Sequence, residues 1–406
     1  MSIALQFKNV DILFAPSQGN RSKLLNQALS DLAQGATRQQ IQERLQVIVG
    51  VSDASLSVKT GDISVLMGLS GSGKSTLLRA ANRLNPVTRG EVWVRHRNQD
   101  IDVAHCSAAV LRDIRRQTVA MMFQQFGLLP WRTVADNVGL GLELRGESLK
   151  QRAAVVQEKL ALVGLLPWAD RMVSELSGGM QQRVGLARAF ATDAPILLMD
   201  EPFSALDPLI RSKLQDELLG LQQRLKKTIV FVTHDLDEAL KLGNQITILE
   251  GGRIIQTGSP EDIVLHPRTD YVAEFVQHMN PLVVLTGHMV MTPIRWSDSD
   301  LTQGMSLDDA GQIRITGQAQ AFRVESPHGA LTPSQAVRIA ANEIAVRPAS
   351  SSLKDLLGVI HESGKPVLLS ADGQVVGVCG SRETLRALAH SHHQKDRAAV
   401  ELCTQA

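Results

Sequence analysis

The stretch "GLSGSGKST" occupies residues 68–76 and directly follows the apolar run 63–67. It matches the pattern G-x-x-x-x-G-K-[S/T] between an apolar strand and the start of a helix, the context in which such a match is informative. Glycines let the backbone close around phosphate groups and bind them through N–H groups, Lys74 neutralises their charge, and the Ser75 hydroxyl is a ligand for Mg²⁺. The sequence therefore predicts a phosphate-binding loop. Its expected contact residues are Gly68, Ser70, Gly71, Gly73, Lys74, Ser75 and Thr76.

The composition narrows the class of protein. A length of 406 residues suggests two to three domains at about 150 residues each. The formal net charge of +1 argues against binding to nucleic acid through bulk charge. The three cysteines fit no C-x-x-C pattern, which favours reduced thiols in the cytosol. They are Cys106, Cys379 and Cys403.

The sequence shows neither a membrane span nor a signal peptide. The runs "PLVVLTGHMVM" (281–291) and "PILLMD" (195–200) are shorter than the ~20 apolar residues that a bilayer requires. The start "MSIALQFKNV" lacks a basic segment followed by a long apolar one. We expect the chain to begin inside the cell and to stay there.

Strand and helix patterns alternate along the first 280 residues, which predicts an α/β sheet with helices on both faces. Residues 51–68 are interpreted as a hairpin that turns at 60–62 and ends in a buried strand. The other expected strands are 4–14, 91–95, 119–123, 196–200, 228–233, 245–249 and 253–257. The expected helices are 74–83, 108–117, 150–163, 180–192, 208–225, 235–241 and 271–278.

Changes in sequence pattern divide the chain further. Within residues 1–280, two short helices are expected in an insertion at about 15–50, and about 136–190 is expected to form a helical subdomain. The polar, glycine-rich segment 281–342 is interpreted as a linker or a degenerate module. Residues 343–390 predict a smaller α+β module of strand, helix, strand, an Asp372-Gly373 turn, strand and helix. Residues 391–406 follow as a polar tail. "HSHH" (390–393) is interpreted as part of this tail, with metal binding as the alternative.

Two adjacent acids end the apolar run of "PILLMDEP" (195–202). Neighbouring carboxylates repel each other, and a buried strand needs no charge at its end, so a purely structural role explains them poorly. Next to a phosphate-binding loop they have separate uses. Asp200 is expected to hold Mg²⁺, and Glu201 is expected to act as the general base toward the attacking water.

Two further polar residues follow expected strands. His234 in "FVTHDLDEA" (231–239) would usually be structural if taken alone. At the carboxyl edge of a parallel sheet that binds a γ-phosphate, it is expected to donate a hydrogen bond to that phosphate. Gln124 is expected to reach Mg²⁺ and the water. The nearby Leu128, Leu129 and Trp131 are interpreted either as ordinary core or as a docking surface for a partner.

A second glycine turn precedes the helix pattern of "ELSGGMQQRVGLARAF" (175–190). Its N–H groups and the positive end of the helix dipole favour a phosphate group, although the turn has no lysine. Its residues are Ser177, Gly178 and Gly179.

These motifs, in this order, resemble the nucleotide-binding subunits of ABC transporters over about residues 1–280. "LSGGMQQR" (176–183) is similar to the signature motif of that family, and "SALD" (204–207), with Asp207, resembles its D-loop. Phe14 stands where the family places an aromatic residue that stacks on adenine, and Phe7 is a second aromatic residue nearby.

The resemblance narrows to a subgroup. The inserted helices and the runs "MGLSGSGKSTLLRAANRL" and "MDEPFSALDPLIR" resemble ATPases of quaternary-amine importers for glycine betaine, proline betaine or choline. "AEFVQHMNPLVVLTG" (273–287) is most similar to the choline type. Relatives often end in paired cystathionine-β-synthase-like (CBS) modules, and residues 343–389 are similar to one such module.

The resemblance implies a function and an assembly. ATP and Mg²⁺ would bind at a homodimer in which Ser177–Gly179 of one chain approaches the γ-phosphate held by Lys74 of the other. Hydrolysis would drive a separate integral membrane permease, supplied by an extracytoplasmic substrate-binding protein. The chain would lie at the cytoplasmic face of a bacterial inner membrane and bind no nucleic acid.

Three other functions compete with this interpretation. They are an importer ATPase for another small solute, a soluble ABC ATPase that acts on DNA or ribosomes, and a phosphoryl-transferring kinase. The single lysine-containing loop argues against the soluble ATPases with two cassettes, and a kinase has no use for the second glycine turn.

Overall fold

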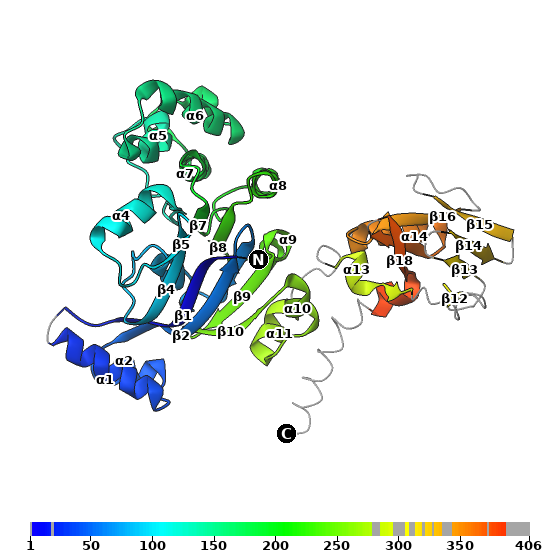
Figure 1. Cartoon of the computed structure of the whole chain (residues 1–406), viewed down its shortest axis with the longest axis horizontal. Helices are drawn as coiled ribbons and strands as arrows, with labels where there is room; N and C mark the ends of the chain where they lie inside the picture. The colour runs from blue at the N-terminus through cyan, green and yellow to red at the C-terminus, as the bar shows by residue number, and fades with distance from the viewer. Residues whose placement is uncertain are drawn as a thin grey trace. The chain divides into compact units, whose positions relative to one another are not determined.

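The computed structural model describes residues 2–17, 20–277, 285–294, 305–307, 313–318, 321–326, 329–334, 343–371 and 373–386. Contacts divide the chain into two compact units, both drawn in Figure 1. The first unit contains Met1–Ile263 and Pro267–Val272. The second contains Val264–His266 and Ala273–Ala406.

The first unit is built on a six-stranded sheet with the strand order β10-β9-β3-β8-β7-β6. All neighbouring pairs are parallel except β9 and β10. β3, β7 and β8 are buried along their whole length, which explains their uninterrupted apolar sequences. The strands are β3 (Ile63–Met67), β6 (Val119–Met122), β7 (Ile196–Asp200), β8 (Thr228–Val232), β9 (Gln245–Glu250) and β10 (Arg253–Gly258).

A second, antiparallel sheet of four strands has the order β2-β1-β4-β5. In Figure 1 its strands run beside the six-stranded sheet. The sequence pattern does not predict this sheet as a separate layer. The strands are β1 (Ile3–Phe14), β2 (Ile48–Lys59), β4 (Arg89–His96) and β5 (Gln99–Asp102).

The expected hairpin at residues 51–68 is wrong. β2 pairs with β1, whereas β3 pairs with β8 and β9, so the turn at 60–62 carries the chain from one sheet to the other. The burial patterns explain the difference, because β2 alternates over much of its length whereas β3 is buried throughout. A half-buried strand suits an antiparallel sheet, and a fully buried one suits the interior of a parallel sheet.

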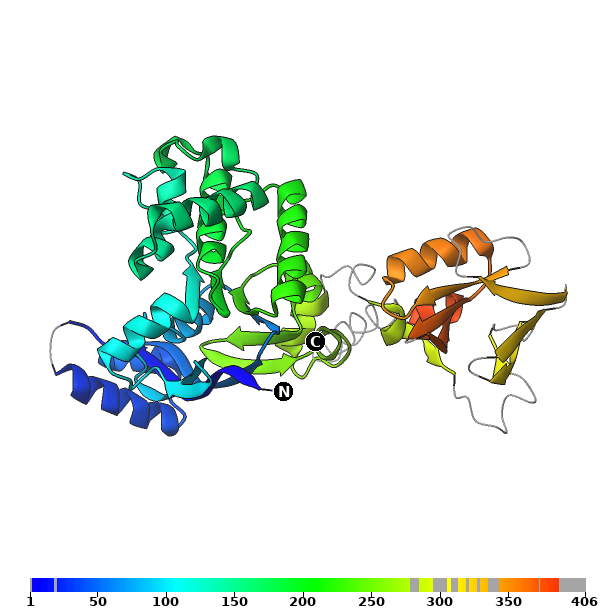
Figure 2. The same cartoon turned by 45° about the horizontal axis from the view of Figure 1, so that its top comes forward.

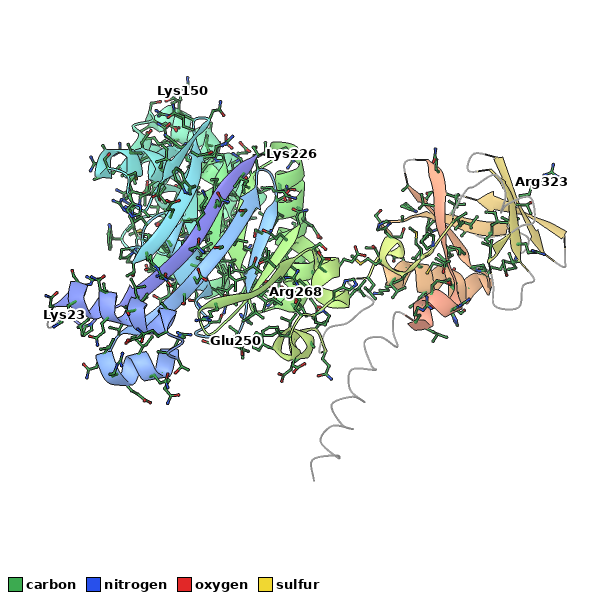
Figure 3. The ribbon with its side chains drawn as sticks, turned by 60° about the horizontal axis from the view of Figure 1, so that its bottom comes forward. Lys23, Lys150, Lys226, Glu250, Arg268 and Arg323 are labelled. Carbon is green, nitrogen blue, oxygen red and sulfur yellow. The ribbon has the colours of Figure 1, made fainter. Side chains whose placement is uncertain are left out.

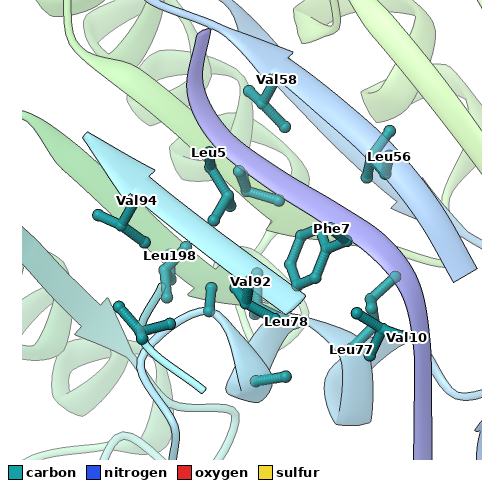
Figure 4. Packing of buried hydrophobic residues seen from close by; sticks show 14 of the residues in the cluster. Leu5, Phe7, Val10, Leu56, Val58, Leu77, Leu78, Val92, Val94 and Leu198 are labelled. Atoms are coloured by element: carbon teal, nitrogen blue, oxygen red, sulfur yellow. The ribbon is translucent and has the colours of Figure 1, made fainter. Parts of the chain in front are cut away.

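One hydrophobic core joins the two sheets and the helix α3 (Lys74–Ala80). Figure 4 shows Phe7 among apolar side chains of both sheets and of α3. Burial of a large apolar side chain stabilises a fold by about 1.5–3 kcal/mol. The helix that follows the phosphate-binding loop is therefore anchored in this core. The labelled members are Leu5, Phe7, Val10, Leu56, Val58, Leu77, Leu78, Val92, Val94 and Leu198.

Two helices, α1 (Arg21–Ala33) and α2 (Arg38–Leu45), are inserted between β1 and β2. Asn20 caps α1 by accepting a hydrogen bond from the Lys23 amide, and Lys23 itself lies on the outer side (Figure 3). The insertion has a small core of its own, so it packs as a unit against the ends of β1 and β2. The core residues are Leu13, Ala28, Leu32, Ile41, Val47 and Val49.

Three helices form the region expected to be helical, α5 (Val134–Arg145), α6 (Leu149–Leu162) and α7 (Gly178–Ala191), with 3₁₀ turns at Leu166–Trp168 and Val173–Glu175. They pack together at one end of the first unit (Figures 1 and 2). The other helices of this unit are α4 (Ala108–Gln117), α8 (Pro208–Leu225) and α9 (Leu236–Leu242). The chain then continues through α10 (Pro260–Leu265) and α11 (Asp270–Gln277).

The second unit contains an eight-stranded sheet with the order β11-β18-β17-β16-β15-β14-β13-β12. Strands β12–β15 come from the segment expected to be a linker or degenerate module. The strands are β11 (Thr292–Pro293), β12 (Met305–Ser306), β13 (Arg314–Gln318), β14 (Ala321–Ser326), β15 (Gly329–Ser334), β16 (Glu343–Pro348), β17 (Val367–Ala371) and β18 (Gln374–Cys379). Among its described residues, helices are formed by α13 (Gly287–Val290), α14 (Leu353–Ser363) and residues 381–386.

Several sequence expectations fall on residues that the structure does not describe. Asp372, Cys403, the HSHH segment and the tail 391–406 lie outside the described residues. Within the described part of the chain, no helix is long and apolar enough to cross a membrane.

The phosphate-binding loop allows a matched test of its packing. A Cβ on Gly68, which has φ +142°, would lie 2.1 Å from the Leu249 carbonyl oxygen, whereas a Cβ on Gly71, at φ +76°, would have no neighbour within 4 Å. Gly68→Ala is expected to lower the free energy of unfolding by at least about 2 kcal/mol through steric overlap and backbone strain. Gly71→Ala is expected to lower it by about 1 kcal/mol through its left-handed backbone alone. Urea denaturation measures both, and equal losses would contradict the expectation.

Candidate functional site

The phosphate-binding loop connects the end of β3 to α3, and its lysine is held inside the loop. Lys74 Nζ donates hydrogen bonds to the carbonyl oxygens of Gly68 at 2.8 Å and Leu69 at 2.9 Å. Gly73 precedes α3 and offers no side-chain cap, so the first N–H groups of this helix have no side-chain partner there. The arrangement suits an anion, because backbone N–H groups and the ammonium converge on one loop.

Burial and charge act on Lys74 in opposite directions. Desolvation lowers the pKa of its ammonium, while the nearby carboxylates of Glu201 and Asp200 raise it. Desolvation is the larger effect. A negatively charged ligand in the loop would favour the charged lysine, because an opposite charge within a few ångströms stabilises the ammonium.

Asp200 ends β7 with a fully buried side chain, and two groups of α3 satisfy its carboxylate. Ser75 Oγ donates to Asp200 Oδ1 at 2.6 Å, and Arg79 Nη2 donates to Asp200 Oδ2 at 2.8 Å. A buried carboxylate requires such partners. Asp200 and Ser75 are expected from the sequence motifs, whereas Arg79 carries no such signal.

Glu201 follows with a left-handed backbone at φ +50°, a conformation that few non-glycine residues adopt. Its two carboxylate oxygens face different neighbours. Gln124 Nε2 donates to Glu201 Oε2 at 3.2 Å, and His234 Nδ1 lies 3.6 Å from Glu201 Oε1. The three residues predicted to act on the water and the γ-phosphate, Gln124, Glu201 and His234, are therefore adjacent.

A cleft of about 390 Å³ brings most of the predicted residues together. It lies where the ends of β3, β7 and β8 meet, because parallel strands share one carboxyl edge. Its polar lining combines a cation, a carboxylate and neutral donors, which suits a phosphorylated ligand. The lining residues are Ser70, Gly71, Gly73, Lys74, Ser75, Thr76, Gln124, Glu201 and His234.

The second glycine turn does not line this cleft. Ser177 caps α7 by accepting a hydrogen bond from the Met180 amide, and Ser177 and Gly178 are exposed. A Cβ on Gly179 would lie 3.2 Å from the Ala205 carbonyl oxygen, so this turn adjoins the SALD segment of its own chain. Asp207 caps α8 by accepting from the Ile210 amide at 3.0 Å.

Sequence reasoning also missed Gln182, one turn into α7 and almost fully buried. Its Nε2 donates to the Glu201 carbonyl at 3.1 Å, and its Oε1 accepts from the Ala205 amide at 3.0 Å. The side-chain amide of Gln182 therefore holds the backbone at Glu201 in place. A glutamine inside a helix gives no sequence signal for such a role.

The two aromatic residues considered for stacking on adenine lie in different surroundings. Phe7 is buried in the core. Phe14 is partly buried, and a Cβ on Gly50 would lie 2.9 Å from its ring and 3.0 Å from Thr76 Cγ2. Phe14 therefore borders the phosphate-binding loop. Trp131 is 69% exposed. This exposure is expected if the residue belongs to a docking surface and not if it belongs to the core.

The donor set near Asp200 fits a magnesium ion. A hydroxyl and a carboxylate, Ser75 and Asp200, already lie within 2.6 Å of each other, and hard oxygen ligands of this kind suit Mg²⁺. Among the described residues, no cluster of three or more His, Cys, Asp or Glu side chains could hold a metal by itself. An ion here would complete its ligands with water and phosphate oxygens, as Mg²⁺ commonly does.

Comparison with known proteins agrees with this site. The family model "ABC transporter" matches residues 51–204. The glycine betaine/proline betaine transport system ATP-binding protein ProV of Escherichia coli (strain K12) is 38% identical, over 96% of this chain and 98% of the relative. The glycine betaine/carnitine transport ATP-binding protein GbuA of Listeria monocytogenes is 48% identical over 66% and 67%. The choline transport ATP-binding protein OpuBA of Bacillus subtilis is 41% identical over 56% and 58%.

Solved structures agree on the fold. The ATP-binding cassette MJ0796, in a dimeric post-hydrolysis state bound to ADP and Pi, is 31% identical with a TM-score of 0.53. The match covers 63% of this chain and 98% of that one.

Fold and site together define a P-loop ATPase of the ABC type, an enzyme that binds and hydrolyses ATP. The chain belongs to the family of ABC transporter ATP-binding proteins, in the subgroup whose named members serve betaine and choline transport systems. The resemblance inferred from its motifs is thereby confirmed.

The geometry around Glu201 predicts a separation of binding from hydrolysis. Glu201→Gln keeps the size of the side chain and removes the base, so turnover of ATP is expected to fall by about 10²–10⁴-fold while ATP affinity stays within a few-fold. Phosphate release and equilibrium binding measure the two quantities. Glu250→Gln, the same change at the exposed end of β9 (Figure 3), is the control. Wild-type turnover in Glu201→Gln would exclude Glu201 as the base.

Proposed function

We propose that this chain is the ATP-hydrolysing subunit of an importer for small quaternary amines of the betaine and choline class. The observation that carries the proposal is the set of polar groups that meet around Glu201 in the cleft. The chain that carries this cleft aligns with ProV over nearly the full length of both proteins. The relatives named above supply the substrate class. The cleft is assigned to ATP in this proposal, so the substrate would bind elsewhere in the assembly.

The residues of the cleft have distinct roles in this proposal. Lys74 and the N–H groups of the loop bind the β- and γ-phosphates, and Phe14 stacks on adenine. Ser75, Gln124 and Asp200 hold Mg²⁺, which when bound neutralises charge on the phosphates. Glu201 accepts the proton of the attacking water, and His234 donates a hydrogen bond to the γ-phosphate.

The working unit is proposed to be a head-to-tail homodimer. The turn Ser177–Gly179, in which Ser177 and Gly178 are exposed, does not line its own chain's cleft, so it is free to approach the cleft of a second copy. Ala205 of the SALD segment lies against Gly179 of this turn, and Asp207 follows it by two residues. A turn of neutral donors adds hydrogen bonds to the γ-phosphate without adding charge.

The remaining parts of the assembly follow from this role. An integral membrane permease would carry the substrate, and an extracytoplasmic substrate-binding protein would deliver it. The chain would bind the permease from the cytoplasmic face of a bacterial inner membrane, and exposed Trp131 is a candidate contact. No nucleic acid is required.

The second unit is proposed to contain a CBS-like module. β16, α14, β17, β18 and the helix at 381–386 follow one another in the expected order. α14 packs on β17 through Leu356 and Ile360, which are buried with Leu369 in one cluster. Strands β14 and β15 extend the same sheet, so the module shares its sheet with the segment before it.

Uptake measurements test the function directly. The chain should be expressed with the permease and binding protein encoded by neighbouring genes, in cells that lack their own betaine uptake. Accumulation of labelled glycine betaine or choline is expected, and Glu201→Gln should abolish it while the protein remains in the membrane fraction. Uptake of an unrelated solute would support the other-solute alternative. A chain that stays in the cytosol with all partners present would exclude transport.

We expect that a substitution in the turn impairs dimerisation but leaves ATP binding by the monomer intact. Ser177→Arg is expected to leave ATP binding by the monomer within about twofold, because the turn does not line its own chain's cleft. Light scattering with ATP in the Glu201→Gln background should then show no dimer. Ser174→Arg, an exposed serine three residues earlier, is expected to dimerise normally. Dimerisation of the Ser177→Arg protein would contradict the shared-site arrangement.

A further inference from the structure

The helical insertion places a cation at the rim of the nucleotide cleft. Arg38 is the first residue of α2, and its Nη1 donates a hydrogen bond to the Gly71 carbonyl oxygen at 3.3 Å. Gly71 itself lines the cleft. A guanidinium that is remote in sequence from residues 68–76 thus lies against this loop.

The position of Arg38 is fixed by its own helix. Thr37 and Gln40 form a reciprocal capping box at the start of α2, with hydrogen bonds of 3.2 and 2.9 Å. Ile41 is buried in the core of the insertion. Arg44 forms an ion pair with Asp31, which ties α2 to α1. Arg38 therefore projects from a helix that is held at both ends.

The insertion also borders the loop where it joins the sheet. Phe14 ends β1, and Gly50 lies near the start of β2. A Cβ on Gly73 would lie only 2.4 Å from the Gly50 carbonyl oxygen, so the loop and β2 pack closely. β2 is thus in contact with the phosphate-binding loop, and Phe14 of β1 lies beside the same residue, Gly50.

The charge of Arg38 has no carboxylate partner among the described residues. Arg79 is neutralised by Asp200 and Arg44 by Asp31, whereas the interaction found for Arg38 is with the neutral carbonyl of Gly71. A guanidinium has five N–H donors, and this contact uses one of them. Arginine at such a rim suits phosphate oxygens, to which it donates strong charge-assisted hydrogen bonds.

We propose that Arg38 is a further nucleotide-binding residue, a second cation for the polyphosphate that the insertion supplies to the cleft. The inference rests on the proposed role of the cleft as the ATP site. Arg38 strengthens binding through its charge, while Glu201 and its neighbours carry out the reaction. Its loss therefore raises the KM for ATP and leaves kcat almost unchanged.

Three substitutions separate charge from simple support of the loop. Arg38→Gln keeps an N–H donor and loses the charge, Arg38→Lys keeps the charge, and Arg21→Gln removes an exposed charge elsewhere in the insertion. In the full-length chain, Arg38→Gln is expected to weaken binding of a non-hydrolysable ATP analogue about tenfold, the typical effect of one charged hydrogen bond. It should also reduce the salt dependence of binding. Arg38→Lys should recover most of the affinity, and Arg21→Gln should match the wild type.

The outcomes distinguish this inference from the proposed function. Wild-type affinity in Arg38→Gln, or an equal loss in Arg21→Gln, would overturn the role of Arg38. An equal loss in Arg38→Lys and Arg38→Gln would also overturn it, because charge would then not be the cause. Lys74→Ala serves as the test of the cleft itself. If Lys74→Ala bound the analogue as well as the wild type, the cleft would not be the ATP site, whatever the Arg38 variants showed.

Discussion

The pairing of the buried Asp200 carboxylate with Ser75 and Arg79 is the interaction on which the site depends. A charge without solvent is tolerated only when it is paired and hydrogen-bonded, and removing one partner of such a group commonly costs 3–5 kcal/mol. Both of its partners, Ser75 and Arg79, come from α3. The end of β7 is thereby tied to the helix that follows the phosphate-binding loop. Glu201, the next residue, is placed by this tie at the mouth of the cleft, where its amide donates to the Val232 carbonyl of β8.

A second link connects that strand end to the helical region. Gln182 of α7 bonds the carbonyl of Glu201 and the amide of Ala205, so one buried side chain holds both ends of the segment between β7 and the SALD turn. The second glycine turn begins the same helix. A displacement of α7 at that turn would consequently reach the backbone of Glu201 through a single rigid amide. This gives the proposed approach of a second chain a physical route to the residue that activates water.

Much of the site could be predicted because it follows strand ends. Asp200 and Glu201 follow one apolar run and His234 closely follows another, and parallel strands bring their carboxyl ends to one edge. The antiparallel sheet was harder to predict from the sequence. β5, with the sequence QDID, is short and polar, and β1 pairs with strands tens of residues away. Nothing local indicates such partners, which is also why the hairpin at 51–68 was misassigned. Arg79 and Gln182 were missed because polar residues within helices usually face solvent.

The contacts of Lys74 show how the loop is prepared for a ligand. Its ammonium donates to two carbonyl oxygens of its own loop, and Ser75 donates to Asp200, so the groups proposed to bind nucleotide already satisfy one another. Desolvation works against the ammonium, as its lowered pKa shows. An anionic ligand would exchange these internal bonds for stronger charge-assisted ones and would also offset the desolvation. The affinity of the loop for nucleotide therefore depends on the difference in free energy between its internal hydrogen bonds and its bonds to the ligand. Cations around its rim, Arg38 included, shift that difference toward the bound state.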